Sequence, residues 1–211
     1  MSVLRLDEAT LLGAVRALAT TDPDLAAVVE RHGPPPLWAR EPGFVTLVQI
    51  ILEQQVSLAS GAAAYERLVR SLRVVDPATL ADTDPTVLEA AGLTRQKTRY
   101  LGALAAAVMD GSLELDGLAN ADDDTVRASL CALPGIGPWT ADVYLLMALG
   151  RPDAWPAADI ALAAATARVK GLPVRPTMIE MTSLAEAWRP WRAVAARILW
   201  HAYLSEKVAR G

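Results

Sequence analysis

The sequence predicts an all-α protein, and three observations support this fold class. Apolar residues recur at helical spacing through most of the 211 residues, and few stretches alternate as a half-buried strand would. Ala and Leu dominate, whereas aromatic residues make up only 5%. Hydrophobic residues reach 53%, which favours a packed core over disorder. At roughly 100–200 residues per domain, the chain forms one domain or two small ones that fold together.

The N-terminal part of the chain predicts two helices followed by a rigid break. A helix is expected over residues 6–19, and the Thr20–Pro23 segment stops it and caps the next helix. The Gly-Pro-Pro-Pro run at 33–36 is the strongest break in the chain. It is too short to detach a domain, so it predicts a crossover between two helical lobes. We expect a terminal lobe of residues 1–33 and 160–211 and a central lobe of residues 34–159.

The central lobe carries most of the polar motifs. An apolar helix is expected over residues 44–52, and it ends in the polar segment Glu-Gln-Gln-Val-Ser at 53–57. Ser57 is typical of an N-cap for the helix that follows. The Gly-Leu-Thr segment at 92–94 opens another helix, which continues to Met109. Short helices punctuated by Pro77 and Pro85, a loop over 111–120 and an acidic helix start at 122–124 complete this lobe.

The most informative segment is a glycine hairpin between two helices, expected over residues 125–149. One helix ends at Leu133, a Pro-Gly-Ile-Gly turn follows, and Pro138 occupies the first turn of the next helix. Glycines permit unusual dihedral angles and leave no side chain between the backbone and a ligand. Free N–H groups of Ile136 and Gly137, beside a positive helix end, would form a cradle for phosphate. An ordinary helix–turn–helix corner capped by glycine is the alternative.

Composition excludes several classes of protein. With 20 basic against 24 acidic side chains, the formal net charge is −4, which excludes a nucleic-acid binder held by bulk charge alone. One cysteine excludes a disulfide framework, a cysteine-rich zinc site and a cysteine-ligated iron–sulfur cluster. Two histidines leave little for a histidine-based metal site. The sequence shows neither an N-terminal signal pattern nor an apolar run of about 18 residues, so we expect a cytoplasmic protein.

Four segments, in order along the chain, resemble the helix–hairpin–helix DNA glycosylase superfamily. The run LPGIGPWTA at 133–141, followed by DAWPAAD at 153–159, resembles its hairpin and the loop that carries its aspartate. The QQVS segment at 54–57 and the GLTRQK segment at 92–97 resemble two further motifs of that group. The WRPWR segment at 188–192 resembles a motif of the 3-methyladenine DNA glycosylase II family.

This resemblance implies two helical lobes with a cleft between them and a base-excision repair activity. The enzyme, an N-glycosyl hydrolase, would flip an alkylated base such as 3-methyladenine or 7-methylguanine out of damaged double-stranded DNA and hydrolyse its glycosidic bond. It would act as a monomer, without a membrane, an organic cofactor or an iron–sulfur cluster. A monovalent cation, Na⁺ or K⁺, bridged by the hairpin carbonyls of Leu133 and Gly135 is also implied.

The resemblance makes Asp159 the catalytic residue. A fixed carboxylate facing the sugar C1′ would stabilise the positive charge that develops as the base leaves, as in glycosidases. Asp159 precedes the expected helix start at Ile160, so a helix N-cap is the other interpretation, and the two are compatible. A charged alkylpurine is already a good leaving group, so the reaction requires no general acid.

Three tryptophans are candidates for the base pocket. Trp200 matches the family's base-stacking aromatic, and a cationic base on its indole would gain about 0.5–2 kcal/mol; a core tryptophan is the alternative. Trp139 and Trp155 are further pocket candidates. Trp139 also stands where related bifunctional enzymes have the lysine that forms a Schiff base with the sugar. Its presence predicts a monofunctional enzyme that leaves the abasic strand intact.

Further residues are expected to bind DNA. Gln55 matches the wedge that fills the space left by the flipped nucleotide, and Gln54 is adjacent to it. A capped helix break is the alternative for this segment. Arg95 and Lys97 stand at a helix start, which does not favour cations, so a phosphate contact competes with a solvated face. The full set of expected DNA-binding residues is Gln54, Gln55, Ser57, Arg95, Lys97, Gly135, Ile136, Gly137 and Thr140.

Two other functions remain open from the sequence. One is a glycosylase for oxidised, deaminated or mismatched bases, against which the single cysteine and Trp139 argue. The other is a non-catalytic helix–hairpin–helix module that only binds DNA, against which Asp159 argues. The range of lesions also stays open, because acceptance of hypoxanthine, ethenoadenine or bases methylated on the pairing edge depends on the shape of the pocket.

Overall fold

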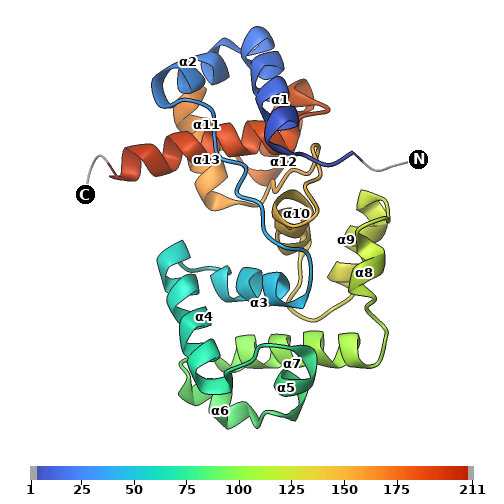
Figure 1. Cartoon of the computed structure of the whole chain (residues 1–211). Coiled ribbons are helices and arrows are strands. Elements are labelled where there is room, and N and C mark those ends of the chain that lie inside the picture. The colour runs from blue at the N-terminus through green and yellow to red at the C-terminus, as the bar shows by residue number, and fades with distance from the viewer. Residues whose placement is uncertain (1–3, 209–211) are drawn as a thin grey trace. The chain divides into compact units, whose positions relative to one another are not determined.

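A computed structural model describes residues 4–208 and divides them between two compact units (Figure 1). The terminal unit contains the chain up to Ala39 and from Leu145 onward, and the central unit spans Arg40–Tyr144. Within residues 4–208 the regular secondary structure is entirely helical, which confirms the predicted fold class. In the same range, none of the helices has the length and hydropathy needed to cross a membrane.

The boundaries of the two units differ from the expected ones at 33/34 and 159/160. The segment between α10 and α11 joins the terminal unit because its backbone pairs there. Leu6 N–H donates to the Gly150 carbonyl at 2.7 Å, and Ala193 N–H donates to the Pro152 carbonyl at 3.0 Å. The loop that leads to Asp159 therefore belongs to the same unit as the C-terminal helix.

The terminal unit is built around the C-terminal helix α13. Figure 1 shows α13 in red against α11 and the two blue N-terminal helices, and these contacts form the core of the unit. Leu11, Leu25 and Ile198 are fully buried there. The helices are α1 (Glu8–Thr21), α2 (Pro23–His32), α11 (Ile160–Val169), α12 (Met178–Ala185) and α13 (Arg192–Val208), with a 3-10 turn η1 (Glu186–Trp188).

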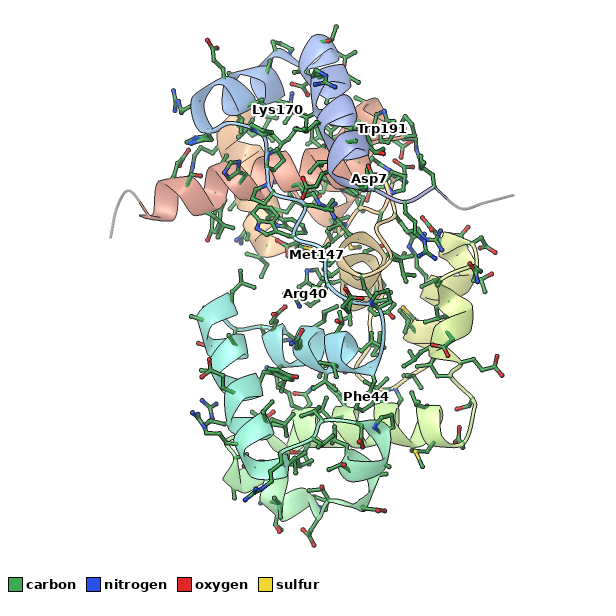
Figure 2. The ribbon with its side chains drawn as sticks, in the orientation of Figure 1. Asp7, Arg40, Phe44, Met147, Lys170 and Trp191 are labelled. Carbon is green, nitrogen blue, oxygen red and sulfur yellow. The ribbon has the colours of Figure 1, made fainter. Side chains whose placement is uncertain are left out.

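A buried polar network around Asp22 ties the N-terminal helices to the C-terminal part of this unit. Asp22 caps α2, as predicted, and its carboxylate also accepts hydrogen bonds from Lys170 Nζ and Trp188 Nε1 at 2.7 Å (Lys170 is labelled in Figure 2). Burial alone would raise the pKa of Asp22, but these hydrogen bonds hold it below its ordinary value. The network therefore stabilises the unit with an ionised carboxylate.

The central unit packs α7 against α3, α5 and α6, and α3 against α4. Thr94 caps α7, which ends at Met109 as predicted. The expected loop over 111–120 is partly wrong, because a short helical turn forms where buried Leu118 anchors the chain. The helices are α3 (Phe44–Glu53), α4 (Leu58–Leu72), α5 (Pro77–Asp82), α6 (Pro85–Ala90), α7 (Arg95–Met109) and α8 (Leu115–Leu118).

Two helices flank the glycine hairpin. Asp122 caps α9 (Asp123–Cys131), and α10 (Pro138–Met147) begins at the proline that the sequence singled out. The α9 helix ends two residues before the expected Leu133, whose N–H instead donates to the Leu130 carbonyl, three residues back, at 3.1 Å. Arg127 Nε donates to the nearly buried Asp142 carboxylate at 2.8 Å, which joins α9 to α10. The two helices thus hold the hairpin from both sides.

Candidate functional site

The hairpin between α9 and α10 has two glycines with different roles. Gly135 has φ of +83°, and a Cβ there would lie 2.1 Å from the Tyr100 ring, so both backbone and packing require glycine. Gly137 is unlike Gly135, because a Cβ there would meet nothing within 4 Å. Gly135 therefore serves the packing of the hairpin on α7, whereas Gly137 leaves open space beside the backbone.

The N–H groups of the hairpin are only partly available to a phosphate. Ile136 N–H donates to the Leu133 carbonyl at 3.2 Å, and the Ile136 side chain is buried, so the prediction of a free N–H at this residue is wrong. Within the described part of the chain, the Gly137 N–H makes no hydrogen bond. The hairpin N–H that stays open is therefore that of Gly137, beside the first turn of α10, where the helix dipole is positive.

Gln54 and Thr140 face inward, although the sequence predicts DNA contacts for both. Gln54 Nε2 donates to the Gly135 carbonyl at 2.8 Å and to Thr140 Oγ1 at 2.9 Å. Thr140 is 2% exposed. The structure thus brings the Gln54 segment and the hairpin together. It does so through hydrogen bonds within the chain, which occupy the Gln54 amide nitrogen and the Thr140 hydroxyl.

Gln55 lies at the exposed turn between α3 and α4. Its backbone is in the left-handed region, with φ of +58°, and its side chain is exposed. Ser57, which follows, caps α4 by accepting from Ser60 N–H at 3.1 Å, so the capping interpretation of Ser57 is confirmed. The geometry therefore leaves Gln55 as the polar side chain of this turn that faces outward.

The two cations at the start of α7 are separated by the structure. The Arg95 side chain is 92% exposed and lies 3.7 Å from a Glu89 oxygen. Lys97 Nζ instead donates to the Leu52 carbonyl at 2.6 Å, and burial lowers the pKa of Lys97. The Arg95 side chain thus lies in solvent near Glu89, whereas Lys97 is directed into the protein.

Asp159 and Trp200 meet in the terminal unit. Asp159 caps α11, and its Oδ1 accepts from Leu162 N–H at 2.6 Å and from Trp200 Nε1 at 3.3 Å. The loop before it is held by Asp159 N–H donating to the Pro156 carbonyl at 2.9 Å. The N-cap interpretation is confirmed, and the carboxylate sits at the positive end of a helix dipole. The predicted catalytic residue and the predicted stacking aromatic thus share one hydrogen bond.

The other tryptophans occupy different surroundings. Trp155 is 5% exposed, its Nε1 donates to the Met181 carbonyl at 3.1 Å, and its ring lies 5.4 Å from that of Trp188. Trp155 is thus a core residue of the terminal unit, and nothing in its surroundings gives it a pocket position. Trp139 is half-buried on α10 in the central unit.

Arg197 is a polar residue of the core that sequence reasoning did not single out. It is fully buried and donates to the carbonyls of Leu37 at 2.8 Å, Ala193 at 3.0 Å and Leu146 at 2.7 Å. Burial lowers the pKa of Arg197 to about 10. The one signal in the sequence is an arginine inside the apolar run that leads to Trp200. Arg197 positions the α13 turn that precedes Trp200.

Comparisons of the sequence with known proteins find a family and related proteins. The model of the HhH-GPD superfamily of base excision DNA repair proteins matches residues 48–190. A probable bifunctional transcriptional activator/DNA repair enzyme of Mycobacterium tuberculosis is 39% identical over 194 residues, which cover 85% of this chain. The chain spans only 37% of the length of that relative.

Solved structures show the same fold. A Schizosaccharomyces pombe 3-methyladenine DNA glycosylase in complex with abasic DNA has a TM-score of 0.84 and 22% identity, with 94% of this chain and 98% of that chain covered. The crystal structure of a Bacillus halodurans DNA-3-methyladenine glycosidase has a TM-score of 0.75 and 26% identity, with 98% and 95% covered. The family match over residues 48–190 confirms the resemblance stated from the sequence motifs.

Proposed function

The chain belongs to the HhH-GPD superfamily of base excision DNA repair proteins, and on this premise we propose that it is a monofunctional DNA glycosylase for alkylated bases. The observation that carries the proposal is the hydrogen bond from Trp200 to the Asp159 carboxylate, because it joins a stacking surface to a charge-stabilising group. The choice of substrate is supported by similar proteins that are named as 3-methyladenine glycosylases. The damaged strand would be met in the cytoplasm, at the nucleoid.

The reaction would be a hydrolysis at the sugar C1′. The enzyme first takes the damaged nucleotide out of the stack, because the bond to be broken is inaccessible within a duplex. The C1′–N bond then breaks, and its electron pair leaves with the base, which neutralises a cationic alkylpurine. Asp159 stabilises the positive charge on the sugar, water oxygen bonds to C1′, and the water proton passes to Asp159 or solvent.

Trp200 would hold the flipped base. A cationic alkylpurine stacked on an indole gains about 0.5–2 kcal/mol over a neutral contact. The hydrogen bond from Trp200 Nε1 to Asp159 fixes the direction of the indole plane relative to the carboxylate. The pair would therefore favour bases that carry positive charge.

The hairpin would hold the DNA backbone through Gly137 N–H and the first turn of α10. The carbonyls of Leu133 and Gly135 fit a monovalent cation, because each accepts one hydrogen bond and retains a second lone pair. When bound, the ion would supply positive charge for a phosphate oxygen. The remaining contacts with the phosphate would come from the N–H groups of Gly137 and the first turn of α10.

The proposal is tested by incubating the protein with a panel of duplexes that carry 3-methyladenine, 7-methylguanine, hypoxanthine, ethenoadenine or 8-oxoguanine. We expect release of the alkylated bases and strands that break only after alkaline treatment. Release of oxidised or mismatched bases alone would favour the alternative glycosylase. Binding without any release would favour a DNA-binding module, and strand cleavage with a borohydride-trapped enzyme would contradict the monofunctional assignment.

A further inference from the structure

The turn between α3 and α4, residues 53–57, is here called the wedge turn. Its Gln55 is not glycine, yet its φ of +58° lies in the left-handed region, a conformation that is unfavourable for a residue with a Cβ. A strained, exposed residue persists only where its surroundings fix it. Residues on three sides of the wedge turn provide this constraint.

The first constraint is Lys97, which reaches the end of α3 from the neighbouring helix α7. Its Nζ donates at 2.6 Å to the carbonyl of Leu52, the residue directly before the wedge turn. The last carbonyls of a helix have no partner within the helix and carry the negative end of its dipole. A lysine ammonium placed there both satisfies a carbonyl and neutralises the dipole.

The second constraint acts on Glu53, the last residue of α3. Arg40, labelled in Figure 2, forms two hydrogen bonds with the Glu53 carboxylate at 2.9 and 3.1 Å. Gly61 on α4 packs against the same side chain, since a Cβ there would lie 2.7 Å from Glu53 Cγ. Arg40 and the start of α4 at Gly61 therefore both contact Glu53, the first residue of the wedge turn.

The third constraint links the wedge turn to the hairpin. The Gln54 amide donates to the Gly135 carbonyl and to Thr140 Oγ1, residues that are more than 80 positions away in sequence. The residue next to the exposed Gln55 is thus anchored on the segment that would hold phosphate. Movement of the wedge turn requires the breaking of these hydrogen bonds.

We propose that Lys97 and Gln54 are positioning residues that hold Gln55 in its strained, outward conformation before DNA is bound. This inference rests on the proposed function for the role of Gln55, but the preorganisation itself is a property of the free protein. A wedge that is already ordered loses less conformational entropy when it enters the duplex. Lys97 would therefore speed base flipping without touching a phosphate.

The first test measures hydrogen–deuterium exchange of the wedge turn in the free protein. Lys97→Met removes the ammonium but keeps the length of the side chain, and Arg70→Met removes one positive charge from an exposed position of α4 as a matched control. We expect exchange of the amides over 54–57 to rise about tenfold in Lys97→Met and to stay unchanged in Arg70→Met. Gln54→Met should give a similar rise.

The second test separates positioning from phosphate binding. Affinity for a duplex with an abasic-site analogue is measured against salt concentration for the parent, Lys97→Met and Arg70→Met. A lost phosphate contact lowers the log–log slope by about 0.9. We expect Lys97→Met to keep the slope of the parent. Flipping, followed by 2-aminopurine fluorescence beside the lesion, should slow about fivefold and be mostly restored in Lys97→Arg.

Three results would overturn the inference. The first is equal amide exchange over 54–57 in Lys97→Met and Arg70→Met. The second is a log–log salt slope of Lys97→Met that is lower than that of the parent by one phosphate contact. The third is an unchanged flipping rate in Lys97→Met. If Lys97→Met does not fold, Gln54→Met and Lys97→Arg carry the same comparisons. Failure of the parent to release any alkylated base would overturn the proposed function alone, because the exchange measurement needs no DNA.

Discussion

The two units use their polar side chains in opposite ways. In the terminal unit, Asp159 and Trp200, two of the residues expected to act on the base, meet each other through a hydrogen bond. In the central unit, Gln54, Thr140 and Lys97 were expected to contact DNA but make hydrogen bonds to the protein instead. The difference teaches that the Asp159 and Trp200 side chains are held against each other, whereas Gln54, Thr140 and Lys97 hold the backbone of their own unit in place.

The largest expected effect concerns Asp159. Asp159→Asn keeps an oxygen that can cap α11 but removes the negative charge, so release of 3-methyladenine should fall by about 100-fold or more, while duplex affinity is retained. Asp159→Ala should in addition lower the free energy of unfolding by about 1 kcal/mol through loss of the cap. Single-turnover base release and chemical denaturation measure the two effects. Equal release by Asp159→Asn and the parent would remove Asp159 from the mechanism.

The two hairpin glycines should respond differently to the same substitution. Gly135→Ala places a Cβ against Tyr100 at positive φ, so the free energy of unfolding should fall by about 2–3 kcal/mol. Gly137→Ala has room, so stability should change by less than about 0.5 kcal/mol, but DNA affinity should fall about tenfold because the methyl group intrudes on the cradle. Urea denaturation and fluorescence anisotropy provide the readouts. Unchanged affinity of Gly137→Ala would place the phosphate elsewhere.

A smaller effect should distinguish Trp200 from Trp155, both of which are buried in the terminal unit. Trp200→Phe loses the hydrogen bond to Asp159 and part of the attraction for a cationic base, so release should slow roughly fivefold, about 1 kcal/mol. Trp155→Phe loses only its hydrogen bond to the Met181 carbonyl, so it should lower stability and leave the rate of base release unaltered. If Trp155→Phe slowed release as much as Trp200→Phe, the pocket would have to include both residues.

The smallest effect is a pH dependence within the terminal unit. The pKa of Asp22 in the folded protein lies below the ordinary value of 3.8, so Asp22 stabilises the fold above that pH. This stabilisation is lost as the pH falls through the lowered folded pKa. We therefore expect the difference in unfolding free energy between the parent and Asp22→Ala to narrow from pH 6 to pH 3. A difference that stays constant over this range would contradict the assignment.

Local chemistry accounts for what the sequence predicted well. Asp22, Ser57, Thr94, Asp122 and Asp159 cap helices at starts that the sequence predicted, because an N-cap depends on the residue and its near neighbours. The direction of Lys97 and Gln54 could not be predicted in this way. Their partners are 45 and 81 residues away, so only the packing of the unit decides whether they face inward. The same applies to Arg197.

The interrupted terminal unit has a consequence for the order in which the protein forms during synthesis. Residues 40–144 are contiguous, so the central unit can fold as soon as it leaves the ribosome. Helices α1 and α2 pack on α13, and Arg197 joins α13 to the Leu37 carbonyl 160 residues earlier. The surfaces of α1 and α2 that pack on α13 can therefore be covered only after α13 has been synthesised, so the terminal unit is completed after the central one.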